Sequence, residues 1–476
     1  MVTSRGAGRR CIPLPSHIMV LNLVAMVCLA IPVLPSRALA AAASSATSAS
    51  TGAKAEKEHH LKAKYHRAFQ AMIHDITNLD KTFAFAELAV QVGDYEGAIS
   101  AFERMLLIDP NLPQVKAELG ALYMRLGSYR MAQSYLQSAL ASPNVPAPVQ
   151  VHIKKLLAKV KERLQPNHLF GSLTFGARFQ SNANAGPSSS LVQVGGSLAT
   201  LSNQYTSKRD WNAFVLGQAT DIYDFQTQGG TTLETDATIY GADQQREKQV
   251  NVGFAELSMG PRFKLFPSAI VNATIKPYGI IDIVTIGHAR DYWAGGAGLD
   301  VTKLLTPTIS LDLVSELRDR IFRNSSELPV NDLQTGLQSY SRIGLAEQVT
   351  PRLSFLEAIA FTNNRAKRKV YANREYAGTL GVTYRYVPAF ALEAGGPWVA
   401  SLVGTHTITP YATPDPTVNS NVSREDKDWE LDFSITIPVN QRLALVGGIG
   451  IFERGSTLPN YRFTNKYASV ALTWRF

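Results

Sequence analysis

The sequence predicts a two-part fold: an α-helical repeat domain followed by a 14-stranded antiparallel β-barrel that spans a membrane. Three observations lead to this prediction: an internal repeat with a period of 34 residues, a change from helical to alternating periodicity near Pro166, and a final strand whose alternation continues to Phe476. Apolar residues make up 45% of the chain, an ordinary share that does not suggest a bundle of membrane helices.

The first 40 residues have the organisation of a secretory signal peptide. A basic start precedes the apolar run IMVLNLVAMVCLAIPVL, and the small-residue motif Ala38-Leu39-Ala40 follows it. A membrane anchor is the alternative, but Pro32 and Pro35 interrupt the apolar run. We therefore expect an exported protein.

The cysteines and the net charge exclude several other classes of protein. Both cysteines, Cys11 and Cys28, lie in the predicted signal peptide, so the mature chain can form no disulfide. Removal of this segment takes away four arginines and no acidic residue, which lowers the formal net charge from +9 to +5. That charge is mild for a chain of this length and does not indicate binding to nucleic acid.

An internal repeat follows a predicted flexible linker. Residues 41–58 are rich in Ala, Ser, Thr, Gly and Lys, which is typical of a linker. Within residues 59–165, the segment GDYEGAISAFERMLLIDP is similar to GSYRMAQSYLQSALASPN. The 34-residue offset aligns Gly93 with Gly127, Tyr95 with Tyr129, Ala98 with Ala132 and Leu106 with Leu140. This period is that of the tetratricopeptide repeat, a pair of antiparallel helices.

The residue types at the repeated positions suit such helix pairs. Small side chains at Ala98 and Ala132 would let the two helices of a unit cross closely, and Gly93 and Gly127 fall at the turn between them. Two units are fewer than such arrays usually need, so we expect helices over residues 59–77 and in VQVHIKKLLAKVKERL to cap the ends. An unrelated pair of helical hairpins is the alternative.

After Pro166, short alternating segments replace the helical pattern. The clearest is WELDFSITI, in which every second residue from Trp429 to Ile437 is apolar and the residues between are polar; ISLDLVSEL and LGVTYRY follow the same rule. Fourteen segments of this kind begin near residues 170, 209, 231, 249, 270, 291, 308, 334, 351, 374, 397, 427, 441 and 464.

The connections and the last strand indicate a closed barrel in an outer membrane. Short turns such as VNQ alternate with long polar loops such as TPDPTVNSNVSREDK, as periplasmic turns and outer loops do in such barrels. Since lipid offers no hydrogen bonds, every strand must be paired. The last strand, YASVALTWRF, is therefore expected to pair with the first, FGSLTFGARF. A large soluble β-sandwich is the alternative.

The alternation also assigns the two faces of the barrel. Trp474 and Phe476 should point outward at the membrane–water interface on the periplasmic side. They also match the aromatic positions of the C-terminal signal that the β-barrel assembly machinery recognises. The charged residues expected in the lumen are Asp312, Glu316, Glu430, Asp432, Arg318, Arg385 and Arg475. Two roles are open for them: mutual pairing that stiffens the lumen, and guidance of a cargo.

The sequence contains none of the catalytic motifs that we sought. It has no Gly-x-Ser-x-Gly, no His-Glu-x-x-His, no phosphate-binding loop and no cysteine cluster. A barrel phospholipase would need a serine and a histidine together on its outer face; His288 and His406 are candidates, but no serine can be placed beside them from sequence. We expect no enzymatic activity, no metal and no cofactor.

From about residue 80 to 476, the order of these parts resembles the surface lipoprotein assembly modifier (Slam) family of Gram-negative outer membranes. FGSLTFGARFQSNANAGPSS resembles the first strand and loop of that family, with Ser181-Asn182-Ala183-Asn184 at the position of Asp-Ser-Asn-Val-Asn. MGPRFKL and IKPYGIIDIVTIG resemble its inner strands, and GSTLPNYRFTNKYASVALTWRF resembles its last hairpin. Two features depart from the pattern: Gln180 stands at the usual Asp position, and the repeat domain is short.

The resemblance implies an outer-membrane translocator that moves a partner protein, a surface lipoprotein or a small secreted protein, from the periplasm to the cell surface. By repeat register, Glu87, Gln91, Gln114 and Arg125 should face the concave groove of the helical domain and bind cargo. The other expected partners are the β-barrel assembly machinery and outer-membrane lipids. Two further functions are open: an exopolysaccharide exporter, which also joins helical repeats to a barrel, and a passive porin with a periplasmic tether.

Overall fold

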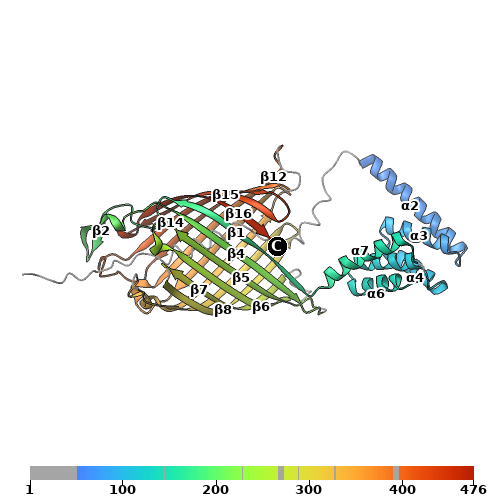
Figure 1. Cartoon of the computed structure of the whole chain (residues 1–476), viewed down its shortest axis with the longest axis horizontal. Helices are drawn as coiled ribbons and strands as arrows, with labels where there is room; N and C mark the ends of the chain where they lie inside the picture. Colours follow the sequence, from blue (N-terminus) through green and yellow to red (C-terminus); the bar gives the residue numbers. More distant parts are fainter. Residues whose placement is uncertain are drawn as a thin grey trace, which may run out of the picture. The chain divides into compact units, whose positions relative to one another are not determined.

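The computed structural model describes residues 51–143, 145–227, 229–265, 273–287, 289–325, 328–389 and 396–476. The predicted signal peptide, with both cysteines, and residues 41–50 lie outside the described residues, as does His288. The chain divides into a helical unit that ends at Pro166 and a β unit from Asn167 to Phe476, each with its own internal packing (Figure 1). The change from helices to strands falls between Leu164, where the last helix ends, and Asn167.

The helical unit contains six helices: α2 (Thr51–His74), α3 (Leu79–Val92), α4 (Tyr95–Ile108), α5 (Pro113–Arg125), α6 (Tyr129–Leu140) and α7 (Ala147–Leu164). Helix α2 begins inside the segment 41–58 that was expected to be a flexible linker, so the linker prediction is wrong for residues 51–58. The reason is the run AKAEKE, whose Ala, Lys and Glu residues are good helix formers. Among the described helices, none is long and apolar enough to cross a membrane.

The two predicted repeats are the pairs α3–α4 and α5–α6. Both first helices end in the same way: Asp94 N–H donates to the carbonyl of Ala89, and Ser128 N–H donates to the carbonyl of Tyr123, each bond 2.9 Å long and 34 residues from its counterpart. Gly93 has φ +87°, and Gly127, its partner in the repeat, has φ +77°. This left-handed conformation favours glycine and lets the chain reverse after a helix.

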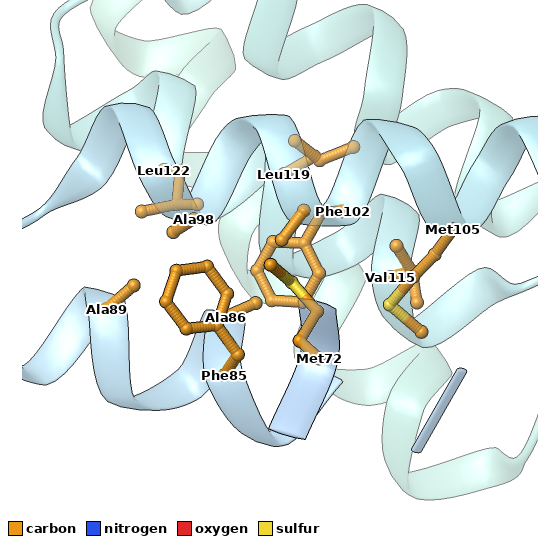
Figure 2. Close-up of a cluster of buried hydrophobic side chains, with 11 residues drawn as sticks. Met72, Phe85, Ala86, Ala89, Ala98, Phe102, Met105, Val115, Leu119 and Leu122 are labelled. Atoms are coloured by element: carbon orange, nitrogen blue, oxygen red, sulfur yellow. The ribbon is translucent and has the colours of Figure 1, made fainter. Parts of the chain in front are cut away.

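Packing in the helical unit uses small residues where helices cross and large ones between the pairs. Phe85 and Phe102 lie in one cluster with Ala86 and Ala98, and all four are buried (Figure 2). In the second pair, a Cβ atom added to Gly120 would lie 2.5 Å from Leu136 Cγ, so α5 and α6 approach as closely as a glycine allows. The helices are therefore held by their apolar faces and not by propensity alone.

The β unit is a closed antiparallel barrel of fourteen strands, in which β1 pairs with β4 on one side and with β16 on the other (Figure 1). Its strands are β1 (Asn167–Gln180), β4 (Asp210–Asp224), β5 (Thr232–Gln244), β6 (Val252–Lys264), β7 (Ala273–Ile286), β8 (Ala289–Thr306), β9 (Ile309–Phe322), β10 (Gly336–Gln348), β11 (Leu353–Asn364), β12 (Asn373–Tyr386), β13 (Trp398–Pro410), β14 (Glu425–Pro438), β15 (Leu443–Ser456) and β16 (Phe463–Arg475). The predicted strand count, antiparallel order and first-to-last closure are confirmed.

We call the end of the barrel where β1 begins and β16 finishes the terminal end, and the opposite end the loop end. Each strand begins within three residues of its predicted start. The expected alternation of turn lengths holds only in part, because two residues separate β7 from β8 at the loop end, while eleven separate β12 from β13 at the terminal end. The small hairpin of β2 (Leu191–Val194) and β3 (Ser197–Thr200), within the first loop, was not predicted.

The outer surface of the barrel has the layered composition of a membrane-spanning wall. A band of exposed apolar side chains includes Ile239, Ile281, Leu317, Ile359, Leu380 and Ile449. Exposed aromatic side chains flank it: Trp211, Trp293, Phe361, Tyr376 and Trp429 at the loop end, and Tyr223, Phe225, Phe263, Tyr384, Trp474 and Phe476 at the terminal end. An apolar band between two aromatic girdles is typical of barrels in lipid.

Candidate functional site: the barrel lumen and the leading helices

The lumen contains a cavity of about 1270 Å³ that runs from one end of the barrel to the other. At the terminal end it is lined by Arg385 and Arg475, and at the loop end by Tyr371, Asp415 and Tyr461. All seven charged residues predicted to face the lumen line this cavity, so that prediction is confirmed: Asp312, Glu316, Glu430, Asp432, Arg318, Arg385 and Arg475.

Strands β5 to β10 form a wall of charged groups that pair with one another, here called the charged wall. At its centre Arg318 bonds to three carboxylates, those of Glu316 (2.6 Å), Glu256 (2.7 Å) and Asp282 (2.8 Å). Beside it, Arg342 pairs with Asp312 at 2.6 Å. Nearer the terminal end, a second set joins Arg262 and Lys276 to Glu234, Asp236 and Asp300. Mutual pairing therefore accounts for the predicted residues on this wall.

Large side chains in the lumen lie flat where the neighbouring strand has a glycine. A Cβ atom added to Gly298 would lie 2.3 Å from Tyr278, whose hydroxyl donates to Glu316. In the same way a Cβ atom on Gly450 would meet Tyr467, which donates to Asp432. Glycine at these positions lets a ring cover the adjacent strand without entering the centre of the lumen.

Strands β11, β12 and β13 form a wall of a different kind, here called the small wall. Glu375 near the loop end and Arg385 near the terminal end line the cavity on this wall, and between them the lining side chains include Ala358, Ala360, Ala377, Thr379, Thr383, Ser401, Thr405 and Thr407. Pairs of hydroxyl groups connect the strands, as between Thr379 and Thr405 (3.1 Å) and between Thr383 and Ser401 (3.2 Å). Between the levels of Glu375 and Arg385, no cavity-lining residue of this wall is charged and Leu356 is the largest, so the space of the lumen is left open along this stretch.

Half of the loop end is filled by the start of the first loop. Residues 182–186 are buried. Asn182 N–H donates to the side chain of Asn465 on β16 (3.0 Å), and Asn184 holds the returning chain through Lys208 N–H (2.9 Å). Side-chain amides of Gln180, Asn212 and Gln244 bond to one another beneath them. The motif that resembled a family signature is therefore a buried structural segment.

The other half of the loop end is held by an arginine between two rings. The Arg424 guanidinium carbon lies 3.5 Å from the ring centroid of Tyr461 and 4.5 Å from that of Tyr411, and the group pairs with Asp426 at 2.6 Å. Such stacking combines cation–π attraction with a charge-assisted hydrogen bond. Arg424, its two tyrosines and Asp415 line the cavity at this position but do not fill it.

On the helical unit, ionisable groups from three helices lie within electrostatic reach of Glu118. Glu118 is half-buried on α5, and this burial raises the pKa of its carboxyl group. Glu87 of α3 raises the pKa further, whereas His152 of α7 and Arg125 of α5 lower it, so all three lie within electrostatic reach. Helices α3 and α5 are the first helices of the two repeats, and α7 follows the second repeat where the first helix of a third repeat would begin. These three are the leading helices.

The structure places the four predicted groove residues on the first two leading helices, and all four are exposed. Glu87 and Arg125 belong to the cluster around Glu118. Gln114 and Arg125 lie eleven positions apart on α5, which puts them on one face but about 16 Å apart along the helix. Their role in binding a partner stays a prediction. Sequence reasoning missed Glu118 and His152, although Glu118 is four positions after Gln114 and shares its face.

The trailing side of the repeats carries a structural network. The rings of Tyr123 and Tyr135 stack with centroids 5.4 Å apart, and their hydroxyl groups donate to Glu103 at 3.1 and 3.4 Å. Partial burial and the bond to Glu103 raise the pKa of Tyr123 to about 12. These contacts join α4, α5 and α6 and so hold the leading helices in place.

Other predicted residues can also be located. His406 stacks on Trp429 with ring centroids 4.0 Å apart, within the aromatic girdle, and its Nδ1 lies 2.8 Å from the Asp428 carbonyl. Trp474 and Phe476 point outward and contact each other with centroids 5.2 Å apart. Their recognition by the assembly machinery stays a prediction.

In the described part of the chain, no group of three or more His, Cys, Asp or Glu side chains is placed to hold a metal ion.

Comparisons with known proteins agree with the helical unit. A family model described as tetratricopeptide repeat matches residues 89–159. Similar solved structures include the type III secretion chaperone SycD of Yersinia enterocolitica in complex with a peptide of the translocator YopD (14% identity, 23% of this chain and 85% of that chain, TM-score 0.21). Others are MamA (15%, 23% and 64%, TM-score 0.20) and the first repeat domain of Spaghetti (RPAP3) bound to an HSP90 peptide (17%, 24% and 86%, TM-score 0.20). None of the curated proteins compared with the chain matches it.

Fold and site together define a class of protein. The chain carries a tetratricopeptide-repeat domain ahead of a closed, 14-stranded transmembrane β-barrel of the outer-membrane type. This architecture fits a translocator or a porin.

Proposed function

We propose that the protein moves a partner protein from the periplasm to the cell surface through the outer membrane, and that the leading helices of the repeat domain bind this partner. The observation that carries the proposal is the cluster of Glu87, Glu118, Arg125 and His152 across three leading helices of a domain covalently joined to a barrel. Repeat domains of this type bind other proteins through such surfaces.

Topology supports a periplasmic position for the helical domain. The chain enters β1 at the terminal end, and an even number of antiparallel strands returns the chain to that end. In outer-membrane barrels this is the periplasmic end. A partner bound to the leading helices would then be kept at high local concentration near the barrel, because the two units share one chain.

The chemistry of the leading helices suits an extended or partly folded partner. The predicted groove residues differ in charge: Gln91 and Gln114 carry neutral amides, and Arg125 can bind a carboxylate in a bidentate manner. Together with Glu87, they give α3 and α5 four polar side chains that can form hydrogen bonds to the backbone and side chains of an extended partner. The resemblance to the surface lipoprotein assembly modifier family points to the same function.

The experiment compares the surface proteins of cells that contain the full chain, no chain, or a chain without residues 59–165. Intact cells are treated with a membrane-impermeant label, and barrel amounts are matched by immunoblot. We expect at least one protein to be lost from the surface, and retained inside, in both the second and the third strain. Loss of a surface polysaccharide with unchanged surface proteins would support an exporter of polysaccharide instead, and an unchanged surface in all strains would contradict delivery.

A further inference from the structure

The cavity of the lumen is asymmetric in the middle of the barrel. On the charged wall, the Arg318 group and the ring of Tyr278 occupy the space next to the strands. Next to it, on β11 to β13, the stretch of the small wall between Glu375 and Arg385 presents only aliphatic and hydroxyl groups to the cavity. The strand register brings the uncharged side chains of this wall together. Ala358 pairs with Thr379, and Thr379 pairs with Thr405, so these positions form a continuous row across three strands.

The loop end shows the same asymmetry. Residues 182–186 and the amides of Gln180, Asn212 and Gln244 are packed over β1, β4 and β5, and none of them lines the cavity. The cavity reaches the loop end instead at Tyr371, Asp415 and Tyr461, which lie in the connections that follow β11, β13 and β15. The open part of the loop end is therefore on the same side as the small wall.

A buried arginine without a full set of partners points into this space. Arg320 on β9 is only 9% exposed and lines the cavity, and its Nε has no hydrogen-bond partner among the described residues. A buried guanidinium nitrogen that is not bonded to protein is satisfied by water or by an anion. The cavity thus contains a fixed group suited to water and small ions.

We propose that the barrel conducts water and small ions along the small wall, and that the half of the loop end filled by residues 182–186 stays shut during conduction. A hydroxyl-lined stretch replaces part of the hydration of an ion, and the absence of charged side chains between Glu375 and Arg385 on this wall keeps the ion from binding tightly there. This activity goes beyond partner delivery and needs no partner protein. Its failure can therefore be told apart from failure of the proposed function.

The first test narrows the small wall after the barrel has assembled. The predicted mature chain has no cysteine, so a single Thr405→Cys substitution gives one reactive site in the lumen. The full chain is purified, placed in a planar lipid bilayer with potassium chloride, and treated with a water-soluble methanethiosulfonate reagent. We expect conductance to fall roughly two- to threefold because the added group fills part of the conducting space. The matched control is Ile359→Cys, which is 64% exposed toward lipid and should show no change.

The second test locks the filled half of the loop end. Ser188 N–H donates to the Arg462 carbonyl at 2.8 Å, a main-chain separation that a disulfide can span, so Ser188→Cys with Arg462→Cys should tie the loop to the β15–β16 connection. We expect the same conductance with the disulfide formed and reduced. The proposal is overturned by an untreated barrel that does not conduct, by equal conductance before and after modification at position 405, or by a locked loop whose reduction restores current.

Discussion

Gly171 and Phe476 exchange two backbone hydrogen bonds, each 3.1 Å long, between the start of β1 and the residue that follows β16. The pair closes the barrel at its terminal end. The approach is close: a Cβ atom added to Gly171 would lie 2.7 Å from the Phe476 ring and 2.3 Å from the Gln218 carbonyl oxygen. The last residue is thus both a member of the closing ladder and part of the aromatic girdle.

Deletion of Phe476 should prevent assembly of the barrel. The change removes both backbone bonds to Gly171 and the aromatic ring that anchors the last strand in the girdle at the membrane–water interface. We expect loss of the heat-modifiable band of the folded barrel and degradation of the chain in the periplasm. Phe476→Tyr keeps the backbone bonds and the ring and is the control. Normal outer-membrane amounts of the shortened chain would refute this account of closure.

Arg318→Met should destabilise the assembled barrel. Three carboxylates, from Glu256, Asp282 and Glu316, would lose the cation that they share, and Asp282 has a side chain that is only 2% exposed. Breaking a buried ion pair from one side costs about 3–5 kcal/mol. The temperature at which the folded band converts to the unfolded band should fall. Arg342→Met, which removes a single pairing with Asp312, should lower it less. Equal effects of the two variants would show that the shared arginine has no special role.

Gly120→Val should destabilise the helical unit without affecting the barrel. The new Cβ atom would lie 2.5 Å from Leu136 Cγ and 3.3 Å from the Ala132 carbonyl oxygen, so α5 and α6 must separate. Overpacking of this kind costs about 1–3 kcal/mol. Thermal unfolding of residues 41–166, followed by circular dichroism, measures the loss. Ala84→Val, at an exposed position of α3, is the control for helix propensity. If both variants unfold at the same temperature, the close approach of the helices is not needed.

Glu118→Gln should stabilise the helical unit at neutral pH and have little effect in acid. The pKa of Glu118 is raised in the folded state, mainly by burial, so the folded protein binds the proton more tightly than the unfolded chain. Stability from this group is therefore fully present below the unfolded pKa and is lost as the pH rises through the folded pKa. Denaturant unfolding of both proteins across this range tests the sign. A stabilisation that does not change with pH would contradict it.

Much of the barrel could be predicted because lipid and lumen impose opposite demands on alternate residues. In β14, the side chains from Trp429 to Phe433 that face lipid are apolar, and Glu430 and Asp432 between them face the cavity. The repeat was equally predictable, because Gly93 and Gly127 lie 34 residues apart and each stands at the turn between the two helices of its repeat. The hairpin β2–β3 was missed because its strands are four residues long, too short for a periodic signal.

The candidate sites were only partly predictable, for a physical reason. Which residues face the lumen follows from alternation along one strand, but the pairing of Arg318 with residues of β6 and β7 depends on register between strands. The small wall likewise arises only when three strands are placed side by side. On the helical unit, spacing placed Glu87 and Arg125 on exposed faces, whereas His152 joins them through packing of α7 that the sequence pattern does not reveal.

The central claim is that the leading helices bind the partner that reaches the surface. Its most direct test reverses two charges without changing the net charge, in Glu87→Arg with Arg125→Glu. The matched control, Glu96→Arg with Arg104→Glu, makes the same exchange on exposed positions of the trailing helix α4. Surface labelling of the delivered protein is measured at equal barrel amounts. We predict that the first double variant strongly reduces surface delivery while the control retains it. Equal delivery by both double variants and the unaltered chain would contradict the claim.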